Sequence, residues 1–235
     1  MTQDELDELV RHHQAWFSAR NGRQLNLQGE NLARLSLAGY RLHECRLCDI
    51  DLSEADIRGA AFLRAKLKNV RFLRATGEGV RFSDAKLWDC SFDGAHLSAA
   101  AFDGVYATRC SFADAVLTEA SLVKADLIDV HMERANLSEI NALRLYMRGG
   151  SMVSAHLVEA DFRKALFVDV DFKHSNVTNA AFDAARFRGI KAYGMVGRPA
   201  FLEEFSAEAV DVSALGDKTD VWDGKRFLAW LDSYR

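Results

Sequence analysis

A five-residue hydrophobic period limits what this chain can fold into. From Leu27 to Phe187 every fifth residue is large and apolar, except Gly77, Ala107 and Ala142, and no insertion breaks the register. This period matches neither the 3.6 residues of a helical turn nor the two-residue alternation of a strand. The chain must therefore turn every five residues while keeping one large side chain on the inside.

A second column of small apolar residues runs two positions before the first, as at Ala55, Val70 and Cys90. A polar residue, often Asp or Asn, stands between the two columns, so the repeated unit reads A-(D/N)-L-x-x. If each unit forms one side of a square and both apolar residues point inward, four units close a coil of 20 residues.

Units such as residues 54–57 and 134–137 resemble those of the pentapeptide-repeat family, and the resemblance covers about residues 25–192. It implies an all-β solenoid, a right-handed quadrilateral β-helix of about eight coils. At about 4.8 Å per coil the rod would be roughly 40 Å long. Gly77, beside Gly79, marks either a bend or thinner coil, or a tolerated packing irregularity.

The sequence at both ends predicts helices, and we expect these helices to cap the solenoid. Open ends would expose strand edges and the last apolar layer. We divide the chain into an N-terminal helical cap (1–24), the β-helix (25–192) and a C-terminal helical cap (193–235). Residues 3–17 have helical apolar spacing behind a Thr2/Glu5 capping box. The predicted inner face of this helix comprises Leu6, Leu9, Val10, His13, Trp16 and Phe17.

In the C-terminal cap a short helix is predicted after Pro199, from the spacing of Phe201, Leu202 and Phe205. A second helix follows, capped by Asp220 or Asp223, with Phe227, Leu228 and Leu231 on one face. Trp222 and Trp230 either pack on the last coil or mark a homodimer or partner contact.

The composition excludes several classes of protein. A net charge of −4 is too small for a polyanion mimic acting through bulk charge, and it has the wrong sign for non-specific nucleic-acid binding. No apolar run reaches the roughly 18 residues of a membrane helix, and the amino terminus is acidic, so we expect a cytoplasmic protein without membrane contact. The four cysteines predict reduced thiols.

No catalytic, metal or cofactor motif is recognisable. Cys45 and Cys48 form a lone C-x-x-C whose residues the register places on opposite sides, inward and outward. His12 and His13 are adjacent on the predicted helix and so face different sides, which prevents shared chelation. We therefore predict no catalytic residue, no metal and no cofactor.

The surface shows a pattern when the sequence is aligned in steps of 20 residues. Residues 76–140 carry six more acidic than basic residues, a belt in the middle of the rod. The belt is either an ordinary solvated surface or an interface for a basic partner. The predicted partner-binding residues are one acidic edge (Asp49, Asp89, Asp129 and Asp169), a glutamate ladder half a coil away (Glu119, Glu139 and Glu159), and two aromatic residues, Trp88 and Tyr106. Trp88 is expected to be unusually exposed. A basic column, Lys124, Arg144 and Lys164, is expected to neutralise the ladder in part.

The family resemblance implies a rigid, non-enzymatic scaffold that binds another protein. Some members resemble duplex DNA in shape and charge and protect DNA gyrase from inhibitors; others occur beside toxins of secretion systems, such as type VI secretion. The acidic surface is confined to the middle coils and no loop projects from the register, so we favour a stoichiometric inhibitor, such as a bacterial immunity protein that neutralises a nuclease-type toxin. A gyrase-binding DNA mimic is the alternative, and a structural adaptor follows if neither holds. We predict a monomer or a homodimer through the C-terminal cap.

Overall fold

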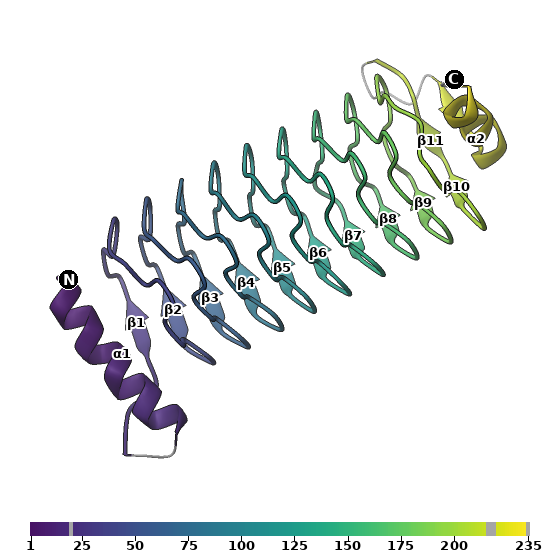
Figure 1. Ribbon diagram of the computed structural model, residues 1–235. Helices are drawn as coiled ribbons and strands as arrows, with labels where there is room; N and C mark the ends of the chain where they lie inside the picture. The colour runs from purple at the N-terminus through teal and green to yellow at the C-terminus, as the bar shows by residue number, and fades with distance from the viewer. Residues whose placement is uncertain (19–20, 215–219, 234–235) are drawn as a thin grey trace.

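The computed structural model, which describes residues 1–18, 21–214 and 220–233, is a rod of stacked coils with one helix at each end (Figure 1). Helix α1 (Gln3–Phe17) lies at the N-terminal end. Helix α2 (Gly224–Asp232) lies at the other end, together with the short antiparallel strands β11 (Val210–Asp211) and β12 (Val221–Trp222). Between them, one side of the rod is a parallel sheet of ten strands in chain order. These strands are β1 (Asn26–Gln28), β2 (Arg46–Cys48), β3 (Lys66–Lys68), β4 (Lys86–Trp88), β5 (Tyr106–Thr108), β6 (Asp126–Ile128), β7 (Tyr146–Arg148), β8 (Leu166–Val168), β9 (Arg186–Arg188) and β10 (Ser206–Glu208).

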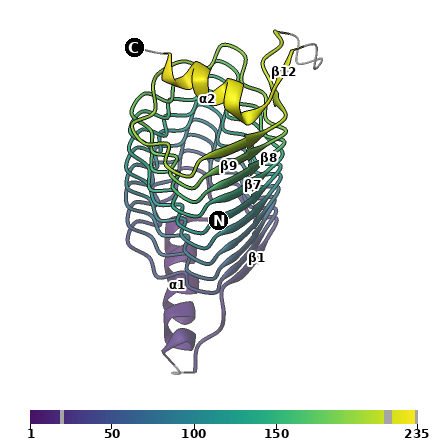
Figure 2. The same ribbon diagram turned by 90° about the vertical axis from the view of Figure 1, so that its right-hand side faces the viewer.

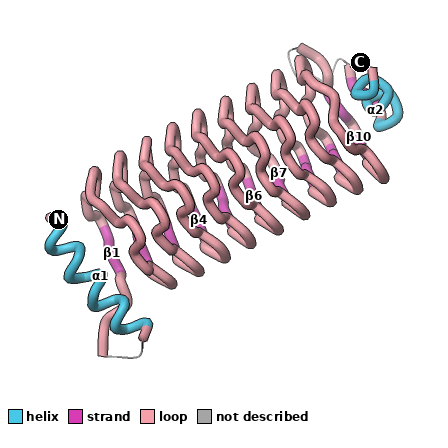
Figure 3. Tube along the Cα trace, viewed as in Figure 1, coloured by secondary structure: helices cyan, strands magenta, loops and turns pink. Residues whose placement is uncertain are grey.

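Successive coils pair at an offset of 20 residues on all four sides. Leu47 pairs with Leu67 in the sheet, and isolated parallel bridges with the same offset, such as Asp56 with Thr76, join the other sides. Turns make up most of each coil, with the short strands confined to one side (Figure 3). The predicted quadrilateral β-solenoid with helices at its ends is confirmed, with about nine turns where about eight were expected.

The corners of the coil explain the five-residue period. The residue two positions after each large inward residue has a positive φ, as at Arg64 (54°) and Asp89 (54°). This left-handed conformation costs a non-glycine residue about 1–2 kcal/mol. An axial hydrogen bond to the next coil offsets the cost, as when the Asp89 N–H donates to the Thr108 carbonyl at 3.0 Å.

The core is a stack of like residues along the axis. Phe72, Phe92 and Phe112 are parallel with 4.6 Å between successive ring centroids, close to the spacing of the coils. Phe82 from the opposite side meets Phe92 edge to face at 5.6 Å. Both arrangements are favourable for aromatic rings.

Gly77 proves to be a packing irregularity within an unbroken coil. Its N–H donates to the His96 carbonyl at 2.7 Å, as the register requires. A Cβ at this position would lie 2.8 Å from Leu97 Cδ2 and 3.0 Å from Ile57 Cγ1, so side chains of the adjacent coils fill the space. The alternative of a bend or a thinner coil is therefore not needed.

The solenoid continues past residue 192, and the predicted helix near Phe201 is wrong. Phe201 forms a parallel bridge with Ala181, and β10 pairs with β9 in the usual register. Large inward residues end at Phe187, and Ala192 and Gly197 occupy the next inward positions, so the sequence pattern fades before the backbone pairing does. The last axial bridge joins Lys191 to Asp211.

Helix α1 closes the N-terminal end as predicted (Figure 1). The Thr2/Glu5 capping box is present, and Leu6, Val10 and His13 are buried. Leu9 and Phe17 were expected on the inner face but are exposed, since the contact with the first coil is narrower than the apolar stripe.

Helix α2 lies across the C-terminal end of the stack (Figure 2). Asp223 is its N-cap and accepts the Arg226 N–H, while Phe227 is buried against Phe187 and Phe205 of the solenoid. Trp230 stacks on Phe227 at 5.6 Å and meets Trp222 edge to face at 6.0 Å. Both tryptophans thus have intramolecular packing partners, and a homodimer through this cap stays a prediction.

Phe92→Ala is expected to lower the free energy of unfolding by about 3–5 kcal/mol, because it opens a cavity between stacked rings. Phe201→Ala is the matched control, since Phe201 is 59% exposed, and it should cost less than about 0.5 kcal/mol. Chemical denaturation followed by circular dichroism measures both. Equal losses would show that the axial stack contributes nothing particular to stability.

The N-terminal cap should loosen as the pH falls. His13 is fully buried, its Nδ1 accepts the Leu25 N–H at 3.0 Å, and burial lowers its pKa below the usual imidazole value. Below a pH of about 6.5 the unfolded segment binds a proton that the folded one excludes, so stability falls. After correction for the intrinsic slowing of amide exchange at lower pH, the Leu25 amide should therefore show an excess exchange rate at pH 5.5 relative to pH 7.5. His13→Gln should remove this excess, whereas exposed His12→Gln should leave it.

Candidate protein-interaction surfaces

The predicted acidic edge occupies one corner of the rod, directly after strands β2, β4, β6 and β8. Each of its four residues has a φ between 51° and 56°. Aspartate and asparagine tolerate this left-handed conformation better than most residues, so the backbone alone favours them here. The acidic edge is therefore partly a consequence of the turn.

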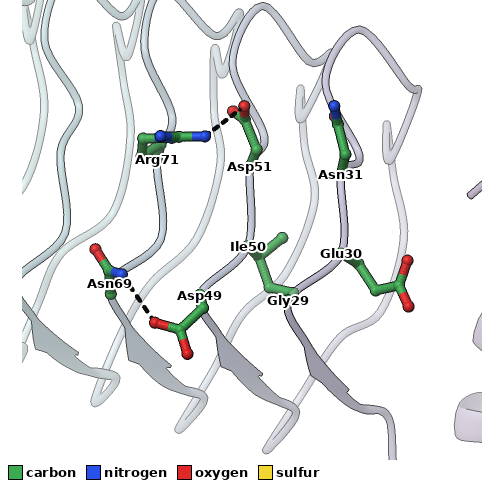
Figure 4. A pocket seen from close by; sticks show the side chains of 8 residues that line it. All are labelled: Gly29, Glu30, Asn31, Asp49, Ile50, Asp51, Asn69 and Arg71. Atoms are coloured by element: carbon green, nitrogen blue, oxygen red, sulfur yellow. Dashed lines mark hydrogen bonds and ion pairs between the residues drawn. The ribbon is translucent and has the colours of Figure 1, made fainter.

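Asp49 is already engaged by its neighbours (Figure 4). It accepts hydrogen bonds from Asn69 Nδ2 at 2.8 Å and from the Cys48 thiol at 3.3 Å, and the Asn69 bond is the main reason that its pKa lies below the usual value. It lines an open pocket of about 220 Å³ in which Asp51 also pairs with Arg71, at 2.8 Å. The pocket's charged groups largely pair with one another.

Asp89 is neutralised within the chain. Arg109, from the same corner of the next coil, donates to both carboxylate oxygens at 2.7 and 3.0 Å, and this pairing holds the pKa of Asp89 below its usual value. The acidic edge is thus interrupted by a cation that pairs with one of its own members.

Asp129 and Asp169 complete the edge in a different way. Their Oδ1 atoms lie over Gly149 and Gly189 of the following coils, in the space that a Cβ would occupy there. Within the described residues neither carboxylate forms an ion pair. Among the described residues, Asp89 is thus the member of the acidic edge that pairs with a cation.

The glutamate ladder consists of exposed side chains at the corner that ends the side opposite the strands. Glu119, Glu139 and Glu159 follow one another at the coil spacing of about 4.8 Å. In the described part of the chain no ion pair joins them to any cation. The expected basic column of Lys124, Arg144 and Lys164 is present and exposed, but it makes no ion pair with the ladder.

Trp88 and Tyr106 lie on the outer face of the sheet, on β4 and β5. Both are half-buried, which corrects the expectation of an unusually exposed Trp88. The nine predicted residues therefore do not form one surface: the acidic edge and the two aromatics share the strand side, and the ladder lies across the rod.

The two cysteines of the C-x-x-C lie on opposite sides of the coil wall. Cys45 is buried, which raises the pKa of its thiol, while Cys48 lies on the outer side. Among the described residues no three His, Cys, Asp or Glu side chains come together to hold a metal. Neither described helix is long and apolar enough to cross a membrane.

Comparison with known families matches the pentapeptide repeats in 8 copies, over residues 31–72, 78–112, 110–141 and 151–189. The chain belongs to the pentapeptide repeat family. Proteins of this family are in general binding scaffolds rather than enzymes, and no enzyme family is indicated. No curated protein sequence matches the chain.

Solved structures of pentapeptide repeat proteins share the fold. HetL of the cyanobacterium Nostoc sp. strain PCC 7120, a protein involved in the regulation of heterocyst differentiation, matches with a TM-score of 0.60 and 21% identity, over 88% of this chain and 98% of HetL. The plasmid-mediated fluoroquinolone resistance protein QnrB1 matches with a TM-score of 0.39 and 18% identity, over 78% of this chain and 89% of QnrB1. At these identities the likeness concerns the fold.

Sequence reasoning missed most of the surface around Trp88 and Tyr106 in this pentapeptide repeat protein. The outward positions of neighbouring strands also hold the half-buried residues Ile128, Tyr146, Leu166 and Val168. Alignment in steps of 20 residues already places them in the columns of Trp88 and Tyr106, so the signal was available.

Neutralising the middle of the ladder should stabilise the rod. Like charges facing each other across adjacent strands are unfavourable, so Glu139→Gln is expected to raise the melting temperature by about 1–3 °C at low salt. The gain should vanish at 1 M NaCl, where the charges are screened. Glu78→Gln is the control. Glu78 interacts favourably with Arg58, so removing its charge should not raise the melting temperature. A loss of stability for Glu139→Gln would mean that other groups of the chain already offset the repulsion between the glutamates.

Proposed function

We propose that this pentapeptide repeat protein is a stoichiometric inhibitor, such as a bacterial immunity protein that neutralises a nuclease-type toxin. The supporting observation is the glutamate ladder, in which Glu119, Glu139 and Glu159 are exposed, repeated at the coil spacing and without an ion pair in the described chain. Such a row carries unfavourable self-repulsion that a cationic partner would relieve.

A nuclease is a partner of matching chemistry. Its substrate is a polyanion, so its cleft is lined with cations that a row of carboxylates can occupy. The solenoid presents this row on a framework held by axial hydrogen bonds, and binding therefore orders little that was not ordered before. Occlusion of the cleft requires no chemistry from the inhibitor. We further propose that it acts in the cytosol, where the nucleic acid under attack lies.

The alternative, mimicry of DNA toward gyrase, receives less support from the surface. Duplex DNA carries one charge per about 1.7 Å of its axis, whereas the ladder offers one per about 4.8 Å over three coils. The acidic edge does not extend this row, because it lies across the rod from the ladder and because Arg109 neutralises Asp89 within it.

The test begins with a search for a nuclease toxin gene beside the gene of this protein, and the toxin found there is then titrated with the protein. Plasmid cleavage should stop at one equivalent of inhibitor. The triple variant Glu119→Lys, Glu139→Lys and Glu159→Lys should require at least about tenfold more protein, since charge contacts at an interface typically contribute more than about 1.4 kcal/mol together.

The matched control reverses three other exposed carboxylates, Glu203, Glu204 and Glu208, and leaves inhibition unchanged. A gyrase supercoiling assay with the same proteins tests the alternative. If the toxin is still inhibited by the ladder variant, the ladder is not the binding surface. Inhibition of supercoiling without any effect on cleavage would replace the inhibitor proposal by the gyrase alternative.

A further inference from the structure

The outer face of the sheet from β4 to β8, here called the strand face, is unusually apolar for a solenoid surface. The parallel register places Trp88 beside Thr108 and Ile128, and Tyr106 beside Asp126 and Tyr146. Leu166 and Val168 continue both columns on β8, and all of these side chains except Asp126 and Thr108 are aromatic or aliphatic. Two exposed cations interrupt this face, Lys86 on β4 and Arg148 on β7, which lies between Ile128 and Val168. On the strands outside it, the same columns hold the exposed cations Arg46, Lys66, Lys68, Arg186 and Arg188.

Asp126 is the one carboxylate at the centre of the strand face. Its register partners are Tyr106 on one side and Tyr146 on the other. Its Oδ1 is buried and accepts no hydrogen bond, and within the described residues the carboxylate forms no ion pair. The residue as a whole is partly exposed, so an incoming group can reach it.

A second unsatisfied oxygen lies on the adjacent strand. Thr108 Oγ1, on β5, is also buried without a hydrogen-bond partner. Leaving a buried polar group unpaired costs free energy, and the cost is larger for a charged group. Two such oxygens on neighbouring strands call for a ligand with several donors.

We propose that the strand face binds another protein through an arginine side chain seated on Asp126 between Tyr106 and Tyr146. A guanidinium group carries five N–H donors, pairs with carboxylates and stacks on aromatic rings. The residues that flank this arginine in the partner would pack on Ile128 and Leu166. An interface of this kind, with an apolar surround excluding water from a central arginine, is typical of binding hot spots.

The charge pattern disfavours the other occupants. In a two-fold dimer with its axis at Asp126, this carboxylate would lie opposite its own copy, and β3 would lie opposite β9, so that Lys66 and Lys68 would face Arg186 and Arg188. A nucleic acid would meet the flanking cations, but its phosphates would be repelled by Asp126 and its bulk would cover apolar side chains. A different protein with a cation at the centre of its interface would pair with the Asp126 carboxylate and cover the apolar side chains around it.

This inference goes beyond the proposed function, because the strand face lies on the side of the coil opposite the glutamate ladder. Each surface can therefore be disabled while the other is left intact.

The test uses dodecapeptides displayed on phage, selected on the full chain and then synthesised. The enriched peptides should share an arginine within an aliphatic segment. Asp126→Asn in the protein, or citrulline in place of that arginine in the peptide, should weaken binding at least about tenfold, since removing one member of a desolvated charge pair typically costs more than about 1.4 kcal/mol. Tyr146→Ser is a second variant, with the same expected loss, and circular dichroism verifies that each variant is folded.

The control carries Glu119→Gln, Glu139→Gln and Glu159→Gln and should bind the peptides with unchanged affinity. Peptides that lack a basic residue, or whose affinity survives both Asp126→Asn and Tyr146→Ser, would overturn the proposal. So would a selection that yields no peptide sensitive to these variants, or a strand-face variant whose main effect is on the binding of DNA or on self-association. Failure here leaves the inhibitor proposal standing, because the ladder variants test that separately.

Discussion

The 20-residue axial register is the constraint on which the rest of the structure depends. Every coil donates and accepts backbone hydrogen bonds with the coils before and after it, which holds like residues above like. Phenylalanine rings therefore stack at 4.6 Å in the core. Outside the core the register places side chains of adjacent coils beside one another, with like charges in the glutamate ladder and opposite charges at Asp89 and Arg109. The corner residues adopt an unfavourable left-handed conformation because an axial hydrogen bond at each turn offsets its cost.

The same register explains why the surface carries the functional information. Because apolar side chains fill the inward positions, the side chains that can meet a partner are those that point outward. Side chains repeated at a fixed spacing form a rigid row. Whether a charged row can attract a partner depends on whether side chains of neighbouring coils neutralise its charge. Arg109 does so for Asp89, whereas no cation among the described residues pairs with Glu139.

The strand face and the ladder differ in kind. The ladder is an exposed row of one charge, suited to long-range attraction that salt weakens. The strand face combines an apolar surround with a single unsatisfied carboxylate, Asp126, suited to short-range recognition of one side chain. The two proposed interactions thus use opposite sides of a rod of the pentapeptide repeat family.

The amino-acid sequence by itself determined the coil, the inward columns, the capping box of α1 and the N-cap of α2, because these follow from periodicity and local backbone chemistry. It did not reveal that the solenoid continues to Asp211, since Ala192 and Gly197 interrupt the apolar signal while axial hydrogen bonds persist. Only the tertiary structure decided which carboxylates are neutralised. That outcome depends on the reach and direction of individual side chains: Arg109 closes on Asp89, and Lys124 extends into solvent without pairing with Glu119.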